Sequence, residues 1–219
     1  LIKKTNDLQL EITHDRDKKV VNGYSQEQVF ELNQKGYARL SGKYPYLNAG
    51  RKSLKKSLIS LQLSYMGFSG YLNPFTNEAQ VNDMGPMYSF PATASHEMAH
   101  QIGYASESEA NFVGFLAAVN NEDKLMQYSG YTLALKYCIR SLDAQDEKLA
   151  DSLFATINPG IRKNFKESRD FWKAYESFVE VGFKMFYDNF LKLNKQDEGL
   201  ESYSRFVDLM VNYYKVEPL

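Results

Sequence analysis

"ASHEMAHQIGYASESEANF", residues 94–112, holds two of the chain's three histidines, His96 and His100, with Glu97 directly after the first. On a helix, residues four apart lie one turn above each other on the same face, so both imidazoles can bind one metal ion. Glu97 lies beside that face, where its carboxylate can accept a proton from a metal-activated water. Because histidine is rare here, HExxH would occur by chance in only roughly one of a few hundred chains of this length and composition. The stretch therefore predicts a helix that carries a metal site and its catalytic base.

A catalytic zinc usually takes three protein ligands and keeps one position for water, so a third ligand has to be found. Gly103 suits a helix end in the left-handed conformation, and the residues after it predict a second helix, so the chain turns back at the site. Ser106 and Glu109 fit an S-x-x-E capping box, which gives Glu109 a structural role at the start of that helix. Glu107 is then free to bind the metal, with Glu109 as the alternative ligand.

Residues 107–111, ESEAN, resemble the E-x-x-A-D or E-x-x-A-N sequence of several glutamate-type zinc peptidases. In those families the glutamate binds zinc, and the Asp or Asn four residues later forms a hydrogen bond with a ligating histidine. The resemblance implies that Glu107 is the third ligand and that Asn111 supports a histidine. This chain departs from those families in spacing, because Glu107 follows His100 much more closely than in most of them.

Longer stretches extend the likeness: residues 64–82, 90–116, 128–131 ("YSGY") and 199–214. Together they resemble a bacterial zincin-like family known only as domain of unknown function 3810, over about residues 43–215. That family typically places several transmembrane helices ahead of such a domain. The resemblance implies a zinc-dependent hydrolase tethered to a bacterial membrane, and we expect the extracytoplasmic side.

Gly, Pro and other turn residues occur at short intervals and form no long linker, which favours one domain over residues 1–219. We expect an α+β, mainly α-helical, zincin-like fold with a small β-sheet. We expect an N-terminal segment and first helix (1–42), a catalytic core with the HExxH helix (43–120) and a helical second half (121–219). The first helix begins at Ser25, where Gln28 completes a capping box, and ends near residues 41–42. Residues 51–83 begin basic and helical and pass into short strands. Later helices are predicted at about 130–142, 145–156, 168–192 and 202–215.

Composition excludes some classes of function. The 26 basic and 27 acidic residues leave a formal charge of −1, so no electrostatic footprint for nucleic acid is present. The single cysteine, Cys138, excludes an intrachain disulfide framework. No apolar run of about 18 residues or more occurs, so this chain is expected to be a soluble domain.

Several other residues carry weaker signals. Residues 77–83, NEAQVND, are a candidate strand for pairing with an extended peptide, and a buried strand or loop that only packs on the helix is equally favoured. Glu78 is expected to anchor the loop. Tyr128 and Tyr131 are candidate donors to a transition-state oxyanion.

The basic residues 51–57 could meet anionic lipid, although a solvated helix face is favoured. The aromatic residues between 171 and 190 are assigned to the core. His14 is assigned to the surface.

The sequence thus favours a zinc metallopeptidase: His96, His100 and Glu107 hold Zn²⁺, and Glu97 moves the proton during hydrolysis of a peptide or protein substrate. The alternative is a sensor or scaffold domain of a membrane-anchored protein that keeps the metal for structure. The intact Glu97 argues against that alternative, since a structural site needs no general base. A third interpretation has no metal and two histidines on a polar helix.

Overall fold

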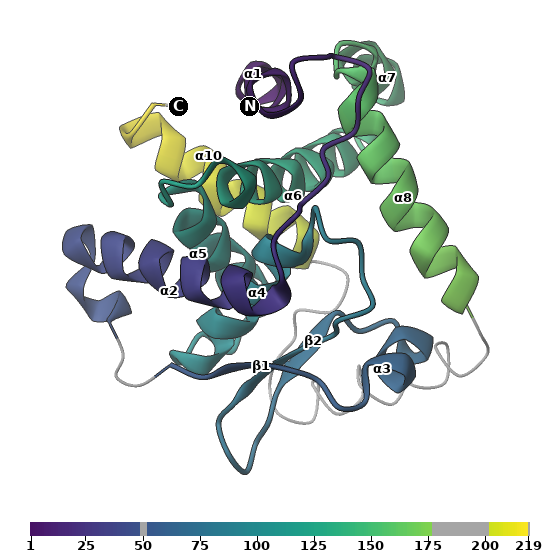
Figure 1. Ribbon diagram of the computed structural model, residues 1–219. Helices are drawn as coiled ribbons and strands as arrows, with labels where there is room; N and C mark the ends of the chain where they lie inside the picture. The colour runs from purple at the N-terminus through teal and green to yellow at the C-terminus, as the bar shows by residue number, and fades with distance from the viewer. Residues whose placement is uncertain (49–51, 177–201, 219) are drawn as a thin grey trace.

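The computed structural model describes residues 1–48, 52–176 and 202–218, and in these the chain is mainly helical with one small sheet (Figure 1). This is the α+β, mainly helical class that the sequence predicts. No helix among the described residues is both long and apolar enough to cross a bilayer. The elements are, in order, α1 (Ile2–Thr13), α2 (Gln26–Lys43), a 3₁₀ turn (Pro45–Leu47), β1 (Leu54–Lys56), α3 (Ser60–Met66), β2 (Gly70–Leu72), β3 (Ala79–Val81), α4 (Phe90–Gln101), α5 (Glu107–Val119), α6 (Lys124–Asp143), α7 (Glu147–Ala155), α8 (Pro159–Tyr175) and α10 (Ser202–Val216).

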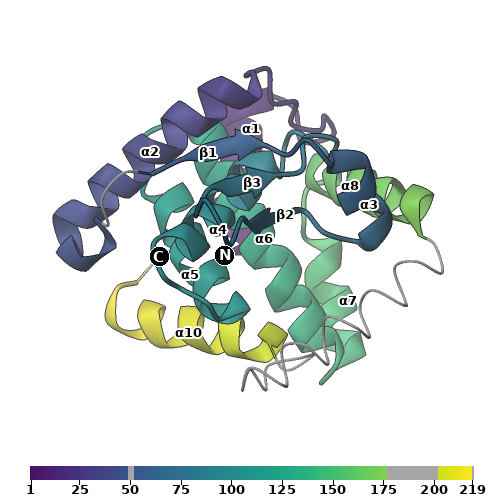
Figure 2. The same ribbon diagram turned by 90° about the horizontal axis from the view of Figure 1, so that it is seen from below.

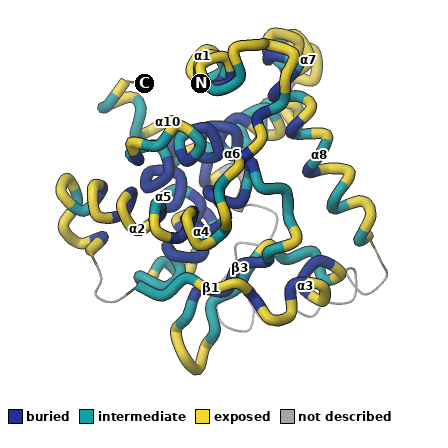
Figure 3. The backbone as a smooth tube through the Cα atoms, viewed as in Figure 1, coloured by how far each residue is buried: buried dark blue, intermediate teal, exposed yellow. Residues whose placement is uncertain are grey.

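Helix α5 lies at the centre of the molecule. It is apolar nearly all round, and a helix of this kind is stable only when it is covered on every side. Helices α2, α4, α6 and α10 supply that cover, and the buried backbone in Figure 3 is concentrated in α4, α5 and α6. Its buried apolar residues are Ala110, Val113, Phe115, Leu116, Ala117 and Ala118.

Helices α4 and α5 meet backbone to backbone at Gly114. A Cβ atom added there would lie 2.8 Å from the backbone nitrogen of His96 and 2.9 Å from the carbonyl carbon of Ser95, closer than real Cβ atoms come. Glycine is the residue that permits such an approach, despite its cost to helix stability. Gly114 also lies two turns after Glu107, so the two residues share the face of α5 that meets α4.

The sheet has the strand order β1-β3-β2, with β3 parallel to β1 and antiparallel to β2. All three residues of β3 are buried, and the sheet packs across α4 (Figure 2). Gln101, the last residue of α4, fixes this arrangement because its side chain bonds the backbone of Ser53 twice. Its Oε1 accepts from Ser53 N at 2.8 Å, and its Nε2 donates to Ser53 O at 3.0 Å.

Two predictions about this region were wrong. Residues 77–83 were one candidate for pairing with a peptide, but β3 is the middle strand, both of its edges are already paired, and it is the buried alternative that the structure shows. Residues 51–57 were expected to begin a helix, but Leu54–Lys56 forms β1, because its backbone pairs with β3. Lys55 and Lys56 form ion pairs with Glu78 and Glu27, which leaves them less suited to anionic lipid. Glu78 also accepts a hydrogen bond from Thr76 at 3.2 Å, which fits its expected loop-anchoring role.

The local helix signals had mixed outcomes. The capping box at Ser25 is confirmed, since Ser25 Oγ accepts from Gln28 N and Gln28 Oε1 accepts from Ser25 N. Helix α1 was not predicted, because its start has no side-chain cap. Helix α8 starts at Pro159, well before residue 168, with the proline in its first turn.

The aromatic residues assigned to the core fall into two groups. Phe171 and Trp172 are only half-buried and pack edge-on against each other, so the core assignment does not hold for them. The aromatic residues from 178 to 190, like the expected helix beyond residue 176, lie outside the described residues. His14 is exposed, as expected.

We expect Gly114→Ala to lower the free energy of unfolding by about 1–3 kcal/mol, because the methyl group must push α5 away from α4. Gly42→Ala is the matched control, since Gly42 is helical and a Cβ there meets nothing within 4 Å. The control should stabilise the protein by about 0.5 kcal/mol through helix propensity alone. Urea unfolding of both variants measures the difference, and equal effects would contradict the close approach.

Candidate metal centre

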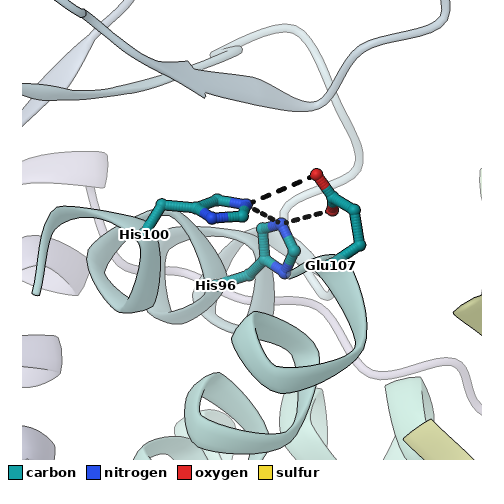
Figure 4. A group of neighbouring side chains, drawn as sticks. All are labelled: His96, His100 and Glu107. Carbon is teal, nitrogen blue, oxygen red and sulfur yellow. Dashed lines mark hydrogen bonds and ion pairs between the residues drawn. The ribbon is translucent and has the colours of Figure 1, made fainter. Parts of the chain in front are cut away.

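Three side chains from two helices converge on one point (Figure 4). His96 and His100 lie one turn apart on α4, and their Nε2 atoms are 3.0 Å apart. Glu107, the first residue of α5, faces them with Oε2 3.2 Å from His96 Nε2 and Oε1 3.5 Å from His100 Nε2. The structure therefore brings together the three residues that the sequence assigned to the metal.

The end of α4 orients His100. Gly103 adopts the left-handed conformation, with φ of 109°, as predicted. Its N–H donates to the carbonyl of His100 and the N–H of Tyr104 donates to that of Ala99, which is the Schellman pattern of a helix end. The same turn places the carbonyl oxygen of Tyr104 2.7 Å from His100 Nδ1. A proton on Nδ1 is thereby held by the backbone, which leaves Nε2 free as a ligand atom.

His96 is less fully supported. Its Nδ1 is buried without a hydrogen bond of normal geometry. Asn111 lies close enough to contribute to the raised pKa of His96, but its Nδ2 donates to Tyr137 Oη at 3.4 Å. The supporting role expected for Asn111 therefore stays a prediction, although Asn111 does lie beside the histidine.

The charges of the site are strongly coupled. Burial lowers the pKa of His96, but the hydrogen bond and negative charge of Glu107 outweigh it and raise that pKa to about 9. Burial raises the pKa of Glu107, but its hydrogen bonds with both histidines hold it well below the usual range. Without a metal, a proton on His96 is thus held against an ionised Glu107.

Glu97 has a different environment from Glu107. Glu97 as a whole residue is only 3% exposed, whereas the side chain of Glu107 is 44% exposed. Burial raises the pKa of Glu97 to about 7, partly offset by the charges of His96 and His100. Gly70 of β2 packs directly on it, since a Cβ at Gly70 would lie 2.4 Å from Glu97 Oε1. Glu97 is therefore a buried carboxylate beside the candidate ligands, with a pKa suited to proton transfer near neutrality.

The alternative ligand, Glu109, does not join the group. Glu109 is exposed, and it is the Glu107 carboxylate that lies close to both histidines. The capping box that led to this choice was nevertheless wrong, because Ser106 is the N-cap residue of α5 but makes no side-chain capping bond. Glu109 instead contributes negative charge to the first turn of α5.

The two candidate oxyanion donors are buried in the helical core. Tyr128 Oη donates to Asn164 Oδ1 of α8 at 2.8 Å, and its ring packs edge-on against Tyr88. Tyr131 packs against Phe115 and forms a hydrogen bond with Tyr214 of α10. Both hydroxyls are committed to packing partners, so neither residue is carried forward as an oxyanion donor.

The geometry of the three donors fits zinc. In a tetrahedral site with metal–ligand bonds of about 2.0–2.1 Å, neighbouring ligand atoms are roughly 3.3 Å apart. The two Nε2 atoms are 3.0 Å apart, and each lies near one of the two Glu107 oxygens, at 3.2 and 3.5 Å, so the distances lie around that value. Two imidazoles and one carboxylate are also a donor set that catalytic zinc sites use, with a fourth position open.

Sequence reasoning missed three features that build the site: Gly70, Gly114 and the carbonyl of Tyr104. A glycine between strand-like residues often marks close approach of a backbone, so Gly70 carried a usable signal. Gly114 could have been found by its spacing of two helical turns from Glu107.

Comparison with known proteins adds a family but no activity. A family model described as "Protein of unknown function (DUF3810)" matches residues 1–211. The match begins at the first residue, so it includes the N-terminal part that the sequence resemblance left out. No curated protein and no solved structure matches the chain.

We expect Glu107→Ala to weaken zinc binding by about a hundredfold or more, because it removes a ligand atom rather than a supporting group. Glu109→Ala is the matched control on the same helix turn and should change zinc affinity little. Its main effect should be a loss of roughly 0.5 kcal/mol of stability from the helix start. Competition with a coloured chelator measures both affinities. If Glu109→Ala lost the metal and Glu107→Ala kept it, the ligand assignment would be wrong.

Proposed function

We propose that this chain, which belongs to the DUF3810 family, is a zinc-dependent hydrolase with a zincin-like site that cleaves peptide bonds. One observation carries the proposal. Two imidazoles and one carboxylate converge closely enough to share one metal ion, while the carboxylate of Glu97, one residue from His96, is buried beside them and left out of the group. A purely structural site has no use for a buried base with a pKa of about 7. The membrane tether implied by the family resemblance belongs to the same proposal.

Zinc held by His96, His100 and Glu107 would lower the pKa of a water molecule and polarise the scissile carbonyl. Glu97 accepts the proton of the attacking water and passes it to the leaving amine. Burial under Gly70 keeps the Glu97 carboxylate from being stabilised by bulk water, so it stays basic enough for this transfer. His100, fixed by the Tyr104 carbonyl, keeps its ligand nitrogen directed at the site.

Strand β2 supports the choice of a peptide substrate. It is an edge strand, and its outer edge has no strand partner in the part of the chain that the structure describes. Gly70 of this strand lies against Glu97, so a peptide paired with β2 would pass close to the base. An extended peptide can add to such an edge through backbone hydrogen bonds. Strand β2 thus takes the role that the sequence had given to residues 77–83.

We expect the purified protein to bind about one zinc ion per chain and to release about one proton or slightly more at pH 7. The proton comes mainly from His96, whose pKa of about 9 keeps it charged in the metal-free protein. Calorimetric titration in buffers of different ionisation enthalpy measures the release. Binding without proton release would contradict the ionisation state assigned to the site, and a protein that does not bind zinc would contradict the proposal.

We expect Glu97→Gln to keep the fold and zinc but to lower turnover of a peptide substrate by roughly a hundredfold to ten-thousandfold, the usual value of a positioned general base. The substitution keeps size and polarity and removes the basic oxygen. Glu109→Gln removes a nearby exposed carboxylate and should leave turnover unchanged. If Glu97→Gln and wild type functioned equally in cells while His96→Ala abolished function, the protein would be a metal-dependent scaffold instead.

A further inference from the structure

A pocket of about 150 Å³ lies against the N-terminal half of α4, the helix that carries His96 and His100. It is formed by the N-terminal half of α4, the middle of α6, the side of α8 and the loop before α4. Thr93 of its wall lies one turn before Glu97 and on the same helix face as His96 and His100. Ser69, on another wall, directly precedes Gly70, which packs on Glu97. The pocket therefore lies along the helix face of α4 that carries His96 and His100, on the N-terminal side of Glu97.

The walls contain one formal charge among the described residues, the ammonium group of Lys136. Aromatic and aliphatic groups, including Phe165, Trp172 and Leu133, form part of the lining. The hydroxyl groups are largely used within the walls. Ser129 Oγ accepts from Ala92 N at 3.0 Å, Thr132 Oγ1 donates to Tyr128 O at 2.9 Å, and the Tyr88 and Ser168 hydroxyls bond each other at 2.6 Å.

Lys136 has no carboxylate partner among the residues that the structure describes. Burial and the positive charge of Arg140 both lower the pKa of Lys136. No lining residue can neutralise it, since the lining contains no Asp or Glu. As a residue, Lys136 is nonetheless exposed. A positive charge without an opposing charge at the wall of a pocket favours an anionic ligand group.

The size of the pocket limits that group. At about 150 Å³ it is smaller than the usual pocket for a drug-sized ligand, and it suits one amino-acid side chain or chain end. The polar lining near Thr93 and the apolar lining near Leu133 together suit a short carbon chain that ends in a charged group.

We propose that this pocket binds a carboxylate of the substrate, with Lys136 as the counter-charge, and so gives the enzyme a preference for an acidic group next to the cleaved bond. The preference rests on the proposed function, since it concerns the substrate of the same site. Two sources offer this chemistry: an Asp or Glu side chain, and the free carboxylate at a peptide's C-terminus. Lys136 would act through direct contact with the substrate, outside the metal ligands.

Binding of a simple dicarboxylate, glutarate, tests the pocket without requiring turnover. For the zinc-loaded full chain, Lys136→Met should weaken glutarate binding about tenfold or more, the usual size of a charge-assisted contact. Lys136→Arg should keep most of the affinity. Lys124→Met is the matched control, because Lys124 lies on the same helix, pairs with Glu11 and does not line the pocket. If wild type did not bind glutarate, or if both methionine variants bound it equally, the proposal would be overturned.

Cleavage of a defined peptide library then identifies the source of the carboxylate. An acidic side chain predicts Asp or Glu next to the cleaved bond in both free and amidated peptides, and Lys136→Glu should reverse this to Lys or Arg. A terminal carboxylate predicts cleavage of free peptides and loss of cleavage on amidation. Cleavage with neither preference would overturn the proposal and leave the hydrolase intact. A library left uncut, with glutarate binding that depends on Lys136, would instead overturn the proposed hydrolase and keep the pocket.

Discussion

The contact between α4 and α5 at Gly114 is the constraint on which the site depends. A side chain at this position would separate the helices, and Glu107, two turns away on the same face, would move with α5. The approach also explains how so short a connection can work. Because Gly103 ends α4 in the left-handed conformation and α5 begins at Glu107, the chain reverses at once and returns along the helix that it has just left. Both features are needed to bring Glu107, only seven residues after His100, back to the two histidines.

The same packing gives two glutamates opposite properties. Glu107 is half-exposed and bonded to two imidazoles, so its pKa falls; Glu97 is buried beneath Gly70, so its pKa rises to about 7. Environment rather than residue type thus separates the candidate metal ligand from the candidate base. The proton on His96 balances Glu107 in the metal-free protein, and a divalent cation would take over that balancing role.

The sequence predicted those parts of the molecule that short-range rules determine. The HExxH stripe, the capping box at Ser25 and the left-handed Gly103 each depend on residues within a turn or two of one another. Errors arose where distant segments decide the outcome. Residues 54–56 form a strand because β3 lies beside them, and β3 has no free edge for a peptide because β2 pairs with its other edge. The hydroxyls of Tyr128 and Tyr131 were likewise unavailable because Asn164 and Tyr214, far along the chain, bind them.

Helix α4 carries two of the three candidate ligands, the candidate base and one wall of the Lys136 pocket, and it is held at its start, middle and end. At its start the N–H of Ala92, which has no partner within the helix, donates to Ser129 Oγ; at its middle Tyr37 Oη donates to the carbonyl of Ser95 at 2.6 Å. At its end Gln101 bonds Ser53. Groups mounted on one rigid element, as His96, Glu97 and His100 are, keep their mutual distances when the surroundings move. Since Thr93 and Glu97 share one face of this helix, recognition of an acidic group in the pocket would set the position of the scissile bond relative to the base.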